Sequence, residues 1–165
     1  MSLPDLAATL WRQRDLLERL TYRLECEQLM LATGRTRFLK NATADVEALV
    51  SELRALELQR ALVAEQAATS AGLPATATLE ELAATVQPPW TGVLLEHREA
   101  LIALTRELGA LAEANKTLMA AGLRAVESVL AGVGGRDGSA SVGYDARGRS
   151  DLAAGAGAMV VDRTL

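Results

Sequence analysis

The sequence contains very few residues of the types that bind metals or act as nucleophiles. Among its 165 residues there is one histidine, His97, and one cysteine, Cys26. A Cys/His zinc site needs several such ligands, and a disulfide framework needs paired cysteines. The sequence therefore predicts a protein without a metal site and without disulfides.

The surroundings of these two residues do not indicate catalysis either. His97 has Glu96 and Glu99 nearby but no second imidazole and no nucleophile, which favours a partly buried polar residue in a helix seam. Cys26 lies between two glutamates, whose charge opposes formation of the thiolate. The sequence has no phosphate-binding, dinucleotide-binding, hydrolase or metalloprotease motif. We expect a protein that is not an enzyme and takes no cofactor and no small-molecule substrate.

Charge and hydropathy indicate the compartment. The net charge is −4 and only two residues are lysines, so attraction to the phosphates of a nucleic acid is disfavoured. The N-terminal residues lack the basic and apolar regions of a signal peptide. No stretch approaches the roughly 18 uncharged apolar residues that a membrane span needs. We expect a cytoplasmic protein that does not bind nucleic acid.

The elements that carry these residues are predicted to be helices, because alanine and leucine dominate the composition. Pro4 and Asp5 suit a helix start, and Gly34 suits a helix end, so a first long helix is expected from about Leu3 to Ala32. Leucines recur along it at a spacing of three and four residues. Its seam consists of Leu3, Leu6, Leu10, Gln13, Leu17, Leu20, Leu24, Glu27 and Leu31.

Two further helices are expected in the middle of the chain. Thr36 is predicted to cap a second long helix from about Arg37 to Ser70, which Gly72 and Pro74 end. Its seam consists of Val46, Leu49, Leu53, Leu56, Arg60, Val63 and Ala67. Thr78 and Glu81 form a capping box, which predicts a short helix that ends near Val86.

A third long helix is expected from Pro89 to about Ala131. Its seam consists of Leu94, His97, Leu101, Leu104, Leu108, Leu111, Asn115 and Leu118. Three long helices joined by short turns predict an all-α protein, an elongated antiparallel bundle with one additional short helix. The bundle domain is expected to cover residues 1–131.

The composition changes at Gly132. Residues 132–165 hold eight of the 13 glycines and have no helical or strand periodicity. Such a segment cannot bury enough apolar surface to offset the entropy of ordering it. We therefore expect a flexible, disordered Gly-rich tail, in which residues 153–158 and Met159–Val161 have no assigned role.

The apolar stripe of the third long helix widens near its C-terminal end. Two adjacent rows of apolar residues with small residues between them make this face, and charges are few. The rows consist of Leu118, Met119, Leu123, Val126, Val129 and Leu130. One explanation is that this end is packed between both other helices. The other is a docking groove for an amphipathic partner helix.

The order of these features resembles that of a known family. Residues 10–39 resemble the first helix and turn of the FlgN-like flagellar type III export chaperones, and residues 88–132 resemble their last long helix. Asn115 followed by Leu118 and Met119 matches a family pattern of an asparagine before paired apolar residues. Tyr144 followed by a glycine-containing turn matches a tail element of the family.

The resemblance implies a function and its residues. Members of this family bind the C-terminal amphipathic helices of hook–filament junction proteins, prevent their premature assembly and present them to the type III export gate. The implied client-binding residues are Asn115, Leu118, Met119, Gly122, Leu123, Val126, Val129 and Leu130. The residues implied to dock on the export gate are Gly143, Tyr144 and Gly148.

An alternative interpretation follows from the leucine seams alone. Heptad-like spacing is typical of coiled coils, so the chain is also compatible with a structural scaffold that oligomerises through its leucines. Polar residues interrupt the seams too often for a long dimeric rod, which ranks the scaffold second. The sequence leaves a homodimer open in either case.

Overall fold

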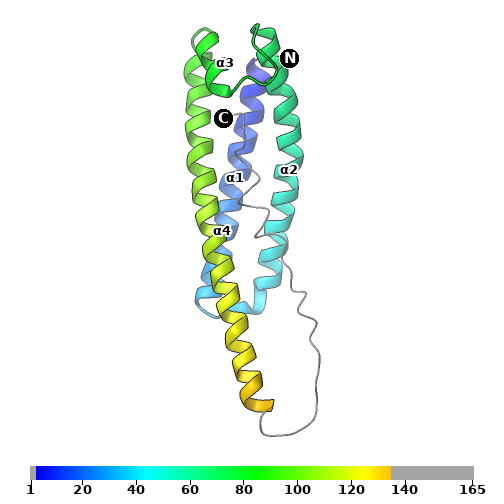
Figure 1. The fold of residues 1–165 in the computed structure, drawn as a ribbon, viewed down its shortest axis with the longest axis vertical. Helices are drawn as coiled ribbons and strands as arrows, with labels where there is room; N and C mark the ends of the chain where they lie inside the picture. The colour runs from blue at the N-terminus through cyan, green and yellow to red at the C-terminus, as the bar shows by residue number, and fades with distance from the viewer. Residues whose placement is uncertain (1–2, 135–165) are drawn as a thin grey trace.

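The computed structural model describes residues 3–134 and confirms an all-α bundle of three long helices and one short helix (Figure 1). The tail residues Gly143, Tyr144 and Gly148, and segments 153–158 and Met159–Val161, lie outside the described residues. The elements in chain order are α1 (Leu3–Ala32), the 3-10 turn η1 (Thr36–Phe38), α2 (Leu39–Ser70), α3 (Leu79–Thr85) and α4 (Trp90–Gly134).

Gly34, two residues beyond the end of helix α1, terminates it as the sequence predicts. Gly34 has a φ of 68°, a left-handed conformation that costs other residues more than glycine. The N–H of Arg35 donates to the carbonyl of Met30 at 3.0 Å, and the N–H of Gly34 donates to that of Leu31 at 3.3 Å. These two bonds satisfy two of the carbonyls in the last turn of the helix. Gly72 has a φ of 79° and ends α2 in the same way.

The start of α2 differs from the prediction. Thr36 does not cap the helix; it begins the 3-10 turn η1, and α2 begins at Leu39 without a side-chain cap. The carbonyl of Thr36 accepts a hydrogen bond from the N–H of Leu39, so a backbone bond takes the place of the expected side-chain cap. The chain therefore reverses between α1 and α2 within a few residues.

The capping box of α3 is confirmed. The N–H of Glu81 donates to the Thr78 hydroxyl at 3.2 Å, and the N–H of Thr78 donates to the Glu81 carboxylate at 2.7 Å. Helix α3 ends at Thr85, where the expected end was near Val86, and α4 continues three residues beyond the expected Ala131.

The long helices alternate in direction, and α1 packs against both of the others (Figure 1). Trp11 contacts His97 near one end of the pair α1 and α4, and Asn115 contacts Leu24 near the other, so these two helices run parallel. Helix α2 runs antiparallel to both. Helix α3 packs against the beginning of α4.

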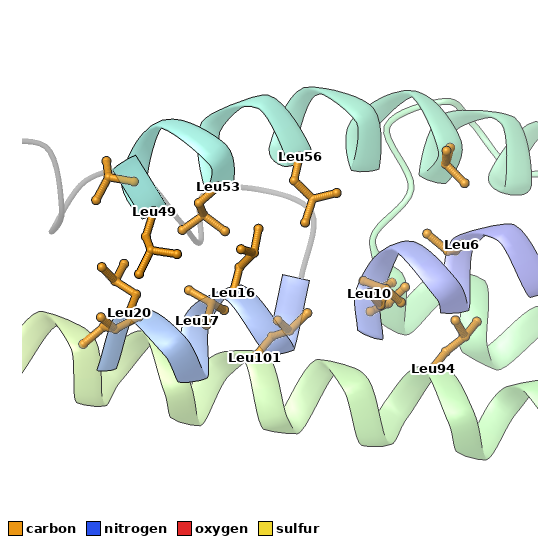
Figure 2. Close-up of a cluster of buried hydrophobic side chains, with 14 of the residues drawn as sticks. Leu6, Leu10, Leu16, Leu17, Leu20, Leu49, Leu53, Leu56, Leu94 and Leu101 are labelled. Carbon is orange, nitrogen blue, oxygen red and sulfur yellow. The ribbon is translucent and has the colours of Figure 1, made fainter. Parts of the chain in front are cut away.

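The core consists mainly of the predicted leucines, which point toward one another from three helices (Figure 2). Leu10 and Leu17 of α1, Leu53 of α2, and Leu101 of α4 are almost fully buried. Leu16 is also buried although it lies outside the predicted seam. All five polar members of the seams are buried as well: Gln13, Glu27, Arg60, His97 and Asn115.

Helix α4 is longer than its neighbours. It has 45 residues, whereas α1 has 30 and α2 has 32. At 1.5 Å per residue the excess over α1 is about 22 Å. Figure 1 shows this end of α4 projecting beyond the connection between α1 and α2. No helix within residues 3–134 has the length and apolarity that crossing a bilayer requires.

Candidate functional site

The projecting end of α4 carries large apolar side chains that no other described part of the chain covers. Leu123 is 62% exposed, Val126 is 56% exposed and Leu130 is 61% exposed, and Val129 is exposed to a similar degree. Every residue from 120 to 131 is exposed. We call Leu123, Val126, Val129 and Leu130 the apolar row.

The apolar row continues the face with which α4 packs into the bundle. Val126 follows Leu108 by eighteen residues, which is five turns of α-helix, and Val129 follows Leu111 by the same interval. Leu108 is buried and Leu111 packs against the core. The row is exposed because α1 and α2 end before they reach it. Packing between both other helices, the first of the two explanations, is therefore excluded for residues 120–131.

The remaining candidate residues lie near the point where α4 leaves the bundle, and Asn115 lies inside the bundle. Leu118 and Met119 are half-buried where α4 leaves it. Gly122 is exposed, and a side chain at this position would have open space around it. Asn115 is only 2% exposed, so it does not share the surface of the apolar row.

Asn115 instead belongs to a buried polar cluster that joins three helices. Its Nδ2 donates to the carbonyl of Leu24 at 2.9 Å and to the Glu27 carboxylate at 3.1 Å. The other oxygen of Glu27 accepts a hydrogen bond from the Thr43 hydroxyl at 2.8 Å. We call Glu27, Thr43 and Asn115 the three-helix cluster. It fixes the register of α4 against α1 and α2 just before α4 leaves the bundle.

A second polar group occupies the middle of the bundle. The side-chain amide of Gln13 in α1 donates to one oxygen of the Glu57 carboxylate in α2. The guanidinium of Arg60 lies 3.1 Å from the other oxygen of Glu57. Gln13 and Arg60, two of the polar members of the predicted seams, therefore both pair with Glu57 inside the chain and are not exposed as a site.

His97 is buried against α1 and lies far from the projecting end. Its ring packs edge-on against that of Trp11, with 4.9 Å between the ring centroids. The Arg14 guanidinium lies over the Trp11 ring, 4.5 Å from its centroid, and pairs with Glu96 at 3.4 Å. Burial lowers the pKa of His97 below its ordinary value of 6.5. The charge of Arg14 lowers this pKa further, and Glu96 partly opposes the change.

The lowered pKa of His97 predicts a pH-dependent stability. Because the native state disfavours the imidazolium, the unfolded chain binds this proton more readily once the pH falls below about 6.5. The free energy of unfolding should therefore be highest above that pH and should decrease from about pH 7.5 to about pH 5.5. Urea denaturation at several pH values measures the slope. His97→Phe should flatten it over this range, and an unchanged slope would contradict the assignment to His97.

The connection between α1 and α2 carries a surface that the sequence interpretation missed. Phe38 is 57% exposed there, and Arg35, Arg37 and Lys40 are exposed around it. The available signal was the absence of any Asp or Glu between residues 27 and 45. Among the described residues, no group of three His, Cys, Asp or Glu side chains is placed to hold a metal ion.

Comparison with known protein families gives a match over most of the chain. The model of the FlgN protein family matches residues 1–151, which include all of the described helices. No curated protein and no solved structure matches the chain. The matched range covers most of the sequence, together with both segments on which the resemblance rests. The chain therefore belongs to the FlgN family of flagellar export chaperones.

Proposed function

We propose that this protein is a cytoplasmic chaperone that binds the apolar C-terminal helices of hook–filament junction proteins. It prevents their premature assembly and delivers them to the type III export gate. The observation that carries the proposal is the apolar row, a set of large side chains left uncovered on a helix of a family that handles flagellar export substrates. An amphipathic helix is the natural occupant of such a face.

The size of the apolar row suits reversible binding. Complete burial of four such side chains contributes roughly 6–12 kcal/mol, at about 1.5–3 kcal/mol each. Association and ordering cost roughly 4–15 kcal/mol. The surplus is small, so we propose that the client also contacts Leu118, Met119 and Gly122 at the boundary. A chaperone that must release its client needs a moderate affinity, which a small net free energy of binding provides.

We propose that the protein acts by binding its client without catalysing a reaction, and that its tail takes part in delivering the client. By the family resemblance, Gly143, Tyr144 and Gly148 dock on the export gate while the helical part holds the client. This separation of the two tasks lets one chain contact a client and the export apparatus at the same time.

The test is a titration with a synthetic peptide of the C-terminal helix of a junction protein from the same organism. We expect saturable binding with a dissociation constant in the micromolar range, together with a gain in helical circular dichroism as the peptide orders. A peptide of the same composition in scrambled order is the control. Equal signals from the two peptides, or none from either, would refute the client-binding role.

The scaffold alternative predicts a different result in solution. The leucine seams are buried inside the single chain, so they are not available to pair with a second chain. The apolar row is an exposed apolar surface that a homodimer could use instead. Sedimentation of the protein alone separates the two functions, because a tight dimer or tetramer at low concentration favours the scaffold and a monomer favours the chaperone.

A further inference from the structure

Three basic side chains lie close together in sequence at the end of the bundle from which α4 projects. Arg35, Arg37 and Lys40 are exposed on and beside the connection between α1 and α2. None of them forms an ion pair with another described residue. The guanidinium of Arg37 lies 5.2 Å from the centre of the exposed Phe38 ring. We call Arg35, Arg37 and Lys40 the basic end.

The basic end lies at the level where the apolar row begins. The hydrogen bonds of Asn115 place that residue beside Leu24 and Glu27 of α1. Since α1 and α4 run parallel with the same rise per residue, the connection after Ala32 lies level with α4 near Leu123. Figure 1 shows the connection at the level where α4 leaves the bundle.

A helix that covers the apolar row and runs along α4 meets the basic end with one of its own ends. The row lies on the bundle-facing side of α4, so it faces the space in line with α1 and α2. A partner helix in that space continues their direction and abuts the connection. The region it meets is positive, because the exposed side chains of the basic end lie there, and the N-terminal end of α2, which has no side-chain cap, begins there as well.

We infer that the partner helix lies antiparallel to α4, with its C-terminal end against Arg35, Arg37 and Lys40. A helix carries its negative dipole end and its terminal carboxylate at the C-terminus, so this polarity joins opposite charges, whereas the reverse polarity joins two positive ends. The inference rests on the proposed function and adds the direction of the client and the chemistry of its anchored end.

The test compares two forms of the junction-protein peptide, one with a free C-terminal carboxylate and one with a C-terminal amide. The amide should bind the unaltered protein about fivefold more weakly. The triple variant Arg35→Gln, Arg37→Gln, Lys40→Gln should lose about five- to tenfold in affinity for the free acid and less than about twofold for the amide. Replacing Arg12, Arg19 and Arg106 by Gln removes the same charge elsewhere and should change neither affinity.

Crosslinking measures the direction independently. A photoreactive residue at the C-terminal end of the peptide should crosslink to residues 33–40, and one at its N-terminal end should crosslink to α4 beyond Leu123. The opposite pattern, or equal affinities of acid and amide, overturns the polarity while the chaperone function stands. Failure of both peptides to bind the unaltered protein refutes the client site and the polarity together.

Discussion

We expect Leu123→Asp to weaken binding of the junction-protein peptide by about 100-fold or more while thermal unfolding stays the same. The substitution removes about 2 kcal/mol of apolar burial from the complex. It also places a carboxylate without a partner in a dry contact, which costs about a further 1–3 kcal/mol. Fluorescence anisotropy of a labelled peptide measures the loss of affinity.

The free protein should tolerate this change because Leu123 makes so little contact within it. The side chain is 62% exposed and lies beyond the ends of α1 and α2. Exposed substitutions of this kind usually alter stability by less than about 0.5 kcal/mol. Calorimetry of the unliganded variant tests this, and a large decrease in its melting temperature would show that the end of α4 packs against the chain.

Leu58 offers a matched control on another helix. Leu58 is 73% exposed, on the side of α2 away from the core. Leu58→Asp makes the same chemical change on a surface outside the proposed client site, so the affinity for the peptide should not change. Equal losses from Leu58→Asp and Leu123→Asp would mean that charge in general, and not the apolar row, controls binding.

Local signals in the sequence were sufficient for most of the fold. The leucine spacing predicted α1, and Pro4, Asp5 and Gly34 predicted the bounds that the structure shows, because such start and end signals act within a single turn. The capping box of Thr78 and Glu81, which predicted the start of α3, also involves residues within a single turn. Thr36 misled the prediction of the start of α2, since a backbone bond within a tight reversal replaced the side-chain cap. The identity of residue 36 as threonine is compatible with both the side-chain cap and the backbone hydrogen bond.

The candidate site was harder to predict because exposure depends on where neighbouring helices end. Asn115 and Val126 lie on the same broad face of α4, so the helical spacing alone predicts the same degree of burial for both. One is buried and the other exposed only because α1 and α2 end between their levels. The family pattern placed Asn115 among the client-binding residues, whereas the structure uses it to hold α4 against α1. The role of the apolar row itself stays a prediction.

The three-helix cluster should show a strong energetic coupling. Asn115→Leu removes a donor from the Glu27 carboxylate, which is 3% exposed and keeps only the Thr43 hydroxyl among its side-chain donors within residues 3–134. A buried charge that loses a partner is expensive, so the variant should lose about 2–4 kcal/mol of stability in urea denaturation. The Oδ1 of Asn115 has no partner among the described residues, so the loss comes through Nδ2.

Replacing both partners separates stability from position. In the double variant Glu27→Leu, Asn115→Leu no charge is left without a partner, so stability should return to within about 1 kcal/mol of the unaltered protein. A double-mutant cycle gives the coupling, and additive losses would contradict a direct interaction. If the cluster serves to set the register of α4, the double variant should bind the peptide more weakly although it is stable, because leucines in place of the cluster allow α4 to shift along α1. Unchanged affinity would mean that leucine packing alone positions the apolar row.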